Sequence, residues 1–233
     1  MAEQGYRLTI VPVKPSEIPS EELLLSLGKE LLASSGSWKA GKTFHKKVKT
    51  YWSAKDTDQG APWHSRVSEH TPEEATFDQL WDKLGKDKAI NEKEFIPDIH
   101  KVTKVKDLSP NASIWTLHYK FPPPVSPRVF TVLQVTYLED ASPRSGYVIS
   151  LPIDLSEDAE LAKLEEKGVR GRYVSVERLS ELENGNIEWR MATSSTPGGS
   201  IPTFIVESTM AGKIAEDVPH FLKWLQSLPP STS

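Results

Sequence analysis

The sequence predicts an α+β fold in which one antiparallel sheet packs against a long C-terminal helix. Two segments of the last third, residues 170–179 and 186–194, alternate apolar and polar residues at period two, as strands with one buried face do. A Pro197-Gly198-Gly199 turn and an amphipathic helix over about 202–226 follow them. The strands upstream follow one another too directly for βαβ crossovers, so we expect the sheet to be antiparallel.

Length and composition place the chain among folded globular proteins. With 233 residues and 37% hydrophobic residues it can build a full core, and we expect one domain over residues 1–233. A net charge of −4 argues against a general phosphate-binding surface for nucleic acid. No cysteine is present, and no segment has the roughly 20 apolar residues of a membrane span or the pattern of a signal peptide. We expect a soluble, cytoplasmic protein.

The first half of the chain contains two predicted helices. The first covers about 19–33, with Ser20 as its N-cap and a leucine stripe on one face. The second covers 72–84, capped by Thr71, because proline and acidic residues suit a first helical turn. Residues 34–41 read as a loop. The predicted strands and short helices of the remaining chain are strands 44–52, 63–68, 100–105, 112–121, 129–138 and 147–153, a short helix near 92–95, and a charged helix or loop over 157–167.

The middle of the C-terminal helix has small residues on its apolar face: Ser208, Ala211, Gly212 and Ala215. Bulky residues such as Ile205 lie toward the ends of this face, and the charges Lys213, Glu216 and Asp217 are predicted on the opposite side. Such a helix either approaches a sheet closely or covers a hollow. We expect the hollow, as a ligand cavity.

One motif matches a phosphate-binding loop letter for letter. Residues 36–43 read GSWKAGKT, the pattern GxxxxGK[ST]. That chemistry needs a buried strand before the loop and a helix after it, so that backbone N–H groups converge on phosphate. Here a leucine-rich helix precedes the loop and an alternating strand follows. We interpret the motif as a helix-to-strand turn with a glycine C-cap.

Two neighbouring strands carry polar residues among apolar ones. Even positions include Thr116 and His118 on one strand, and Phe130, Val132 and Gln134 on the next. Buried polar groups need partners, so His118 and Gln134 either contact each other, face solvent, or contact a ligand. We take these five residues as candidate cavity residues, together with Ile205 and the small residues of the terminal helix. No metal site is expected, because no histidines have ligand spacing and cysteine is absent.

The chain resembles the START (steroidogenic acute regulatory-related lipid transfer) superfamily, which has the helix-grip fold. The residues that carry the resemblance are Ser126-Pro127-Arg128-Val129-Phe130, Lys167-Gly168-Val169-Arg170, Ile187-Glu188-Trp189-Arg190 and Gly198-Gly199-Ser200-Ile201-Pro202. With Trp38 to Phe44 and Val48 to Tyr51, the whole chain is similar to an uncharacterised START-like family of filamentous fungi. The resemblance implies a curved antiparallel sheet around the terminal helix and an apolar cavity between them. His118 and Gln134 fall near an inward acid–base pair of sterol-binding relatives.

Three functions fit this reading. The first is binding, and transfer, of a lipid or other hydrophobic small molecule. The second, an enzyme like the related polyketide cyclases and aromatases, would use His118 as acid or base. The third is a regulatory interaction module. We expect no cofactor, a hydrophobic small molecule or lipid as partner, transient membrane contact, no nucleic acid, and a monomer.

The phosphate-loop motif should be inert. Titration of ATP or GTP with magnesium by calorimetry should show no binding, because no helix N-terminus faces the loop. Lys42→Ala should change nothing. A micromolar dissociation constant that disappears in Lys42→Ala would contradict this interpretation.

Overall fold

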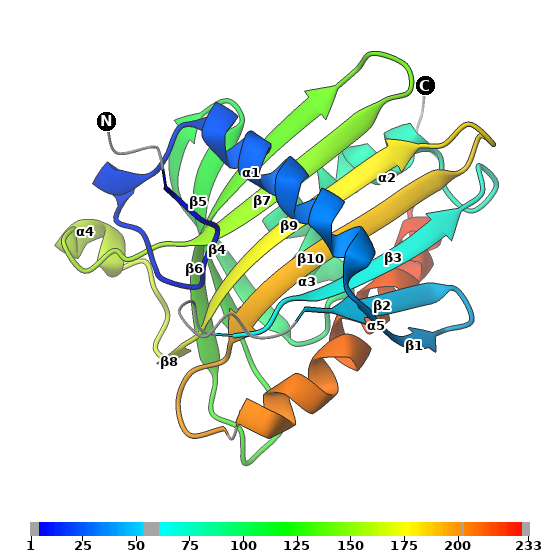
Figure 1. Cartoon of the computed structure of the whole chain (residues 1–233). Helices are drawn as coiled ribbons and strands as arrows, with labels where there is room; N and C mark the ends of the chain where they lie inside the picture. The colour runs from blue at the N-terminus through cyan, green and yellow to red at the C-terminus, as the bar shows by residue number, and fades with distance from the viewer. Residues whose placement is uncertain (1–4, 54–60, 202, 230–233) are drawn as a thin grey trace.

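One curved, antiparallel sheet with helices on both faces forms the molecule (Figure 1). The computed structural model describes residues 5–53, 61–201 and 203–229, and the side chains of 203 and 204 are not described. In this part of the chain the sheet has ten strands: β1 (Lys39–Phe44), β2 (Val48–Trp52), β3 (His64–His70), β4 (Ile99–Ser109), β5 (Ala112–Tyr119), β6 (Arg128–Glu139), β7 (Ser145–Pro152), β8 (Val169–Arg170), β9 (Arg172–Glu181) and β10 (Ile187–Thr196).

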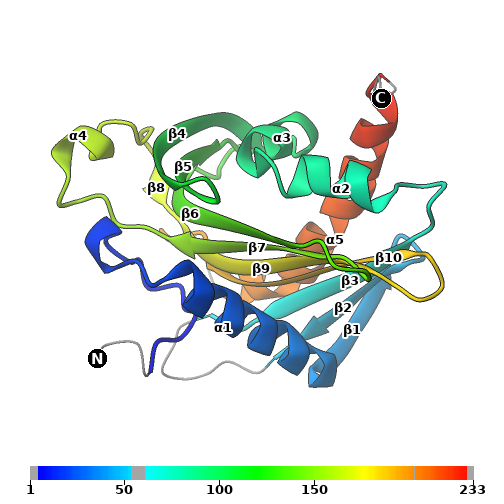
Figure 2. The same cartoon turned by 90° about the horizontal axis from the view of Figure 1, so that it is seen from above.

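The helices divide between the two faces of the sheet (Figure 2). They are the α-helices α1 (Glu21–Ser34), α2 (Phe77–Leu84), α3 (Lys88–Phe95), α4 (Ala159–Ala162) and α5 (Thr203–Ser227), with the short 3₁₀ turns η1 (Pro15–Glu17) and η2 (Ser35–Ser37). Figure 2 shows α1 on one face and α2, α3 and α5 on the other, which we call the inner face. The strand order is β1-β2-β3-β10-β9-β7-β6-β5-β4, and the short β8 pairs in parallel with β6.

Helix α1 packs its leucine stripe on the outer face of the sheet. The Ser20 hydroxyl accepts a hydrogen bond from the Leu23 N–H at 3.3 Å, which caps the helix as an N-cap serine does. Leu24 and Leu32 are buried among residues of β5, β6, β7 and β9. At Gly28 a Cβ would lie 3.2 Å from Ile149 and Val176, so α1 approaches the sheet closely at this point.

Helix α5 packs directly on one side of the inner face. Phe221 is fully buried and meets Trp189 of β10 edge to face, with ring centroids 5.2 Å apart. Ala215 is also fully buried in this cluster, and a Cβ at Gly212 would lie 3.7 Å from the Phe44 ring. The expectation that the small residues of this helix cover a hollow is therefore wrong for Gly212 and Ala215, which let α5 approach β1, β2 and β3.

Two segments differ from the sequence prediction for local reasons. Residues 39–52 form the β1–β2 hairpin, in which His45 and Lys46 adopt positive φ angles of 49° and 64°, where a loop and one strand were predicted. Gly41, Lys42 and Thr43 of the phosphate-loop motif lie in β1, and no helix follows them directly. Helix α2 begins at Phe77 rather than 72, because Thr76 and Gln79 form a capping box there.

The predicted double-glycine turn sets the start of α5. Gly198 and Gly199 have φ angles of +65° and +68°, which L side chains rarely adopt. A Cβ at Gly198 would lie 2.3 Å from the carbonyl oxygen of Arg170, so glycine is also required sterically. The Arg128 guanidinium donates to the Pro197 carbonyl at 3.2 Å and holds the turn against β6.

Replacement of Ala215 by leucine should destabilise the protein by about 1–3 kcal/mol, because the added methylenes have no free space at a fully buried position. Denaturant unfolding would measure this loss. Ser208→Leu on the same helix is the control, since Ser208 is exposed and should tolerate the change. An unchanged stability in Ala215→Leu would mean that α5 does not pack closely on β1–β3.

Candidate functional site

A cavity of about 650 Å³ lies between the inner face of the sheet, α3 and residues 205–220 of α5. We call it the apolar cavity. Strands β5, β6, β7, β9 and β10 form one side of this cavity, and α5 covers it on the other side. Its walls are mainly apolar and aromatic, and they include Ile96, Tyr119, Phe121, Phe130, Tyr173, Met191, Val206, Met210 and Ile214. Tyr119, Phe130 and Tyr173 form a continuous aromatic wall, with centroid separations of 5.2 Å and 5.6 Å.

Buried charges form one end of the apolar cavity. Lys88 of α3 donates to Glu177 of β9 and to Glu92 of its own helix, each at 2.7 Å. The side chains of Lys88 and Glu177 are only 5% and 9% exposed, so this network is shielded from water. Charged side chains are rarely this buried unless they are paired, and here each has a partner of opposite charge. We call Arg66, Lys88, Glu92, Glu177 and Asp217 the charged floor.

Arg66 of β3 extends the charged floor toward β10. Its guanidinium lies 4.1 Å from the centroid of the Trp189 ring and 3.7 Å from the Glu177 carboxylate. The Trp189 indole N–H donates to the same carboxylate at 2.9 Å. Arg66 is 1% exposed, and its Nε and Nη1 atoms have no hydrogen-bond partner among the described residues. The guanidinium is therefore stabilised by the ring and by Glu177 rather than by full hydrogen bonding.

The charged floor shifts the pKa values of its members in opposite directions. Burial alone would lower the pKa of Lys88, but Glu177 and Glu92 outweigh it and raise that pKa. Burial raises the pKa of Glu92, which Lys88 only partly offsets. Burial alone would raise the pKa of Glu177, but the positive charges of Lys88 and Arg66 outweigh this effect and lower that pKa. On α5, burial raises the pKa of Asp217 to about 7.

This arrangement can bind an amphiphile without covalent chemistry. Apolar walls enclose a chain or ring, and a small number of placed polar groups orient the polar end, as in many ligand pockets. Asp217 changes its charge near neutral pH, so the net charge at the floor depends on pH. Among the described residues no group of histidines and carboxylates is arranged to hold a metal ion.

The predicted site residues on the strands separate onto the two faces of the sheet. Phe130 lines the apolar cavity, and Val132 is buried beside it on the same face. In the β5–β6 register Thr116 pairs with Thr131 and His118 with Val129, whereas Gln134 pairs with Ser113. Directly paired residues share a face. The expectation that His118 and Gln134 face each other is therefore wrong, and neither Thr116 nor His118 lines the cavity.

The predicted residues on α5 also separate. Ile205 lines the apolar cavity, but Ser208 is exposed, Ala211 is half-buried outside the lining, and Gly212 and Ala215 face β1–β3. The charged residues predicted on the solvent side, Lys213, Glu216 and Asp217, also line the cavity. Lys213 and Glu216 are exposed as predicted, whereas Asp217 is half-buried. Sequence reasoning also missed Lys88 and Glu177. The available signal was the alternation in β9: Tyr173, Ser175 and Glu177 lie on one face of the strand, and Val174 and Val176 lie on the other face.

Comparisons with known proteins agree with this geometry. A family described as "Protein of unknown function (DUF3074)" matches residues 63–225, more than half of the chain. No curated protein matches the sequence. Human STARD10 is similar in structure with a TM-score of 0.73 and 14% identity, over 91% of this chain and 82% of that one.

Two further human structures are similar over most of their length. The lipid transfer and protein localization domain of StarD13 (DLC2) has a TM-score of 0.67 at 16% identity, covering 91% of this chain and all of that chain. StAR-related lipid transfer protein 5 has a TM-score of 0.68 at 12% identity, covering 89% and 98%. The chain therefore has the START-like helix-grip fold. No helix in the described ranges is long and apolar enough to cross a membrane.

The raised pKa of Asp217 predicts a pH-dependent stability. Its folded value of about 7 exceeds the usual aspartate value near 4, so the folded state binds more protons between these values. Stability of the natural protein should fall as the pH rises through this window, and Asp217→Asn should remove that loss. The stability of the variant relative to the natural protein should increase by roughly 1–4 kcal/mol from about pH 4 to about pH 8.

Urea unfolding across this pH range measures the difference, with Glu216→Gln as the control from the same helix. Glu216 is exposed, whereas Asp217 is half-buried. A stability difference between Asp217→Asn and the natural protein that does not change with pH would contradict the burial of an ionisable Asp217.

Proposed function

The chain belongs to the DUF3074 family of proteins of unknown function, and we propose that it binds a lipid or another apolar small molecule in the apolar cavity. The observation that carries the proposal is the chemistry of that cavity: aromatic and aliphatic walls lead to a buried charged floor. Each methylene that enters such an enclosure contributes about 0.8 kcal/mol. The lipid transfer named for two of the similar structures supports the same class of ligand.

We infer that the ligand lies with its polar end toward Glu177, Lys88 and Asp217. These three side chains line one cavity and offer both donors and acceptors. The apolar part would extend along Phe130 and Met210, which have no charged groups to desolvate. A ligand without a polar group would leave the floor unused, so an amphiphile fits better than a pure hydrocarbon.

We also infer that the ligand enters beside the first turns of α5, where Ile205 lines the cavity and yet is 43% exposed. An exposed apolar side chain at this position suits transient contact with a membrane during loading. Transfer between membranes by a monomer would follow from such contact. Exchange of a fluorescent lipid between donor and acceptor vesicles tests transfer, and absence of exchange by a lipid-loaded protein would reduce the function to binding.

Blocking the cavity from α5 should abolish binding without unfolding the protein. Val206 lines the cavity and is only partly buried, so Val206→Trp should place its indole in the ligand space. We expect at least a tenfold weaker affinity for a fluorescent fatty acid or phospholipid, a loss of about 1.4 kcal/mol. Ser208→Trp is the matched control, because Ser208 is exposed on the same helix and lies outside the lining.

Equal binding by both variants, with both folded, would place the ligand elsewhere. Native mass spectrometry of the protein from its own host would identify a co-purified amphiphile. Recovery of that molecule unchanged after incubation supports binding, whereas its conversion to a product would favour the alternative of a cyclase-like enzyme acting in the same cavity.

A further inference from the structure

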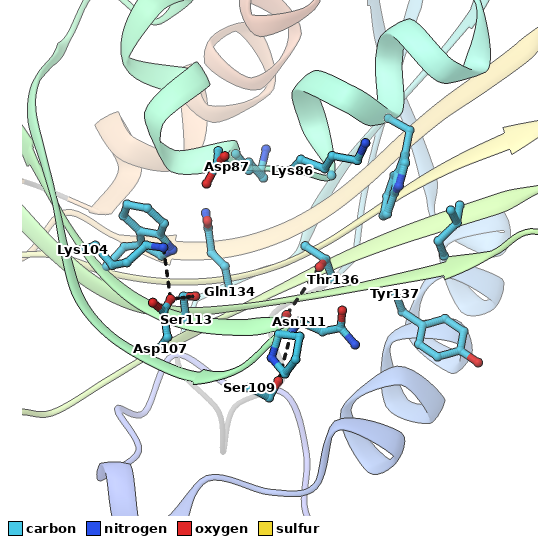
Figure 3. Close-up of a pocket in the computed structure, with 16 residues that line it drawn as sticks. Lys86, Asp87, Lys104, Asp107, Ser109, Asn111, Ser113, Gln134, Thr136 and Tyr137 are labelled. Carbon is cyan, nitrogen blue, oxygen red and sulfur yellow. Dashed lines mark hydrogen bonds and ion pairs between the residues drawn. The ribbon is translucent and has the colours of Figure 1, made fainter.

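A second cavity, separate from the apolar one, lies between the α2–α3 turn, the β4–β5 hairpin and β6 (Figure 3). Its volume is about 750 Å³, and we call it the polar cavity. A hydrophobic cluster that includes Trp115, Leu117 and Val132 lies between the two spaces, and Lys88 of α3 lines both of them. Trp115 lines the polar cavity, while Tyr119 and Tyr173, which pack on the same cluster, line the apolar one. A ligand of the apolar cavity therefore does not account for the polar cavity.

Gln134 is the feature of the polar cavity that calls for a ligand. The residue is only 5% exposed, yet its Nε2 atom has no hydrogen-bond partner among the described residues. Figure 3 shows its amide directed from the sheet toward the turn that holds Lys86 and Asp87, across the cavity. A buried amide without a partner costs about 1–3 kcal/mol. A bound molecule with a hydrogen-bond acceptor beside this nitrogen would satisfy it.

The start of α3 faces the same space and lacks a side-chain cap. Its N-cap residue is Asp87, which has a φ angle of 45° and makes no capping hydrogen bond with its side chain. The first turn of α3 contains no acidic residue. Backbone N–H groups at a helix start need acceptors from outside the helix, and an oxygen of a ligand can supply one.

The charges around the polar cavity are already balanced. Lys104 pairs with Asp107 at 3.1 Å, and Lys86 pairs with Asp82 at 3.3 Å. Asp87 adds a carboxylate beside the α3 start, which disfavours an anionic ligand there. Lys88, the third lysine of the lining, is paired with Glu92 and Glu177. Among the residues that the structure describes, the lining therefore has no unpaired lysine to hold a phosphate.

The remaining groups of the polar cavity are hydroxyls and aromatic surfaces. Ser113 and Thr136 lie beside Gln134 (Figure 3). The Ser113 hydroxyl donates to Asp107 at 2.6 Å and the Thr136 hydroxyl to the Asn111 carbonyl at 3.4 Å, so each oxygen is left to accept a hydrogen bond from a ligand hydroxyl. Trp81 and Trp115 add apolar surface to the lining. We propose that the polar cavity is a second binding site, for a small uncharged polyol such as a cyclic sugar, whose hydroxyls bond Gln134 and the α3 start while its carbon face packs on tryptophan.

Nuclear magnetic resonance with ¹⁵N-labelled protein tests this site through the side-chain amide of Gln134. The Gln134→Met variant identifies that resonance by its absence. Glucose and myo-inositol at millimolar concentration should shift it in a saturable way, and glucose 6-phosphate should bind no more tightly than glucose. In Gln134→Met the affinity for the polyol should fall at least tenfold, while binding of a fluorescent lipid stays unchanged.

The melting temperature of the same variant distinguishes a binding role of Gln134 from a structural role, because loss of a structural residue would lower it. Methionine fills a similar volume and needs no hydrogen bond, so the melting temperature of Gln134→Met should equal or exceed that of the natural protein. The proposal is overturned if neither polyol shifts the Gln134 amide, if only the phosphorylated sugar does so, or if Gln134→Met melts at a clearly lower temperature. Val206→Trp, which blocks the apolar cavity, should leave polyol binding intact.

Discussion

The carboxylate of Glu177 is the constraint on which the inner face depends. It lies on β9 and accepts hydrogen bonds from the Lys88 ammonium of α3 and the Trp189 indole of β10. The Arg66 guanidinium of β3 lies 3.7 Å from it. Three strands and a helix that are distant in sequence therefore converge on one buried anion. Loss of Glu177 would leave the buried Arg66 guanidinium without its carboxylate partner, at a cost of about 3–5 kcal/mol. This network fixes α3 over the sheet and leaves polar atoms at the end of an apolar cavity.

Helix α5 packs closely on the sheet along one side and covers a cavity along the other. Gly212 and Ala215 bring its backbone close to β1–β3, where Phe221 also packs on Trp189. The side that bears Val206, Met210 and the flanking charges lies over open space instead. Close packing on one side thus supports the helix while the other side covers a cavity. The helix-grip geometry produces a hollow because the sheet curves away from a helix that is fixed at one edge.

The inner face also separates two kinds of chemistry. The cluster of Trp115, Leu117 and Val132 fills the space between the apolar cavity and the polar cavity. On the α5 side, side chains of β9 and β10 enclose a space suited to an apolar chain. On the other side, the β4–β5 hairpin and the α2–α3 turn place amide and hydroxyl groups around Gln134. One sheet can therefore present two different environments on the same face, because β9 and β10 lie near the middle of the strand order whereas β4 and β5 lie at one edge.

The sequence by itself determined the elements whose signals are local. Ser20 caps α1, Gly198 and Gly199 turn the chain before α5, and alternation located most strands within a few residues. It also supported the antiparallel sheet with a terminal helix, because directly successive strands leave no room for crossover helices. The β1–β2 hairpin was missed, since two non-glycine residues, His45 and Lys46, adopt the positive φ angles of its turn.

Only the tertiary structure decided which side chains meet. His118 and Gln134 have the same parity on their own strands, but the β5–β6 register is set by the intervening chain, and a shift of one residue exchanges the faces. Asp217 was predicted on the solvent side and Glu177 was missed, because nothing local marks their partners. Glu177 is buried where Lys88 and Arg66 arrive from α3 and β3, and Asp217 lines the same cavity. Local periodicity fixes where an element forms, whereas register and charge pairing depend on contacts between distant segments.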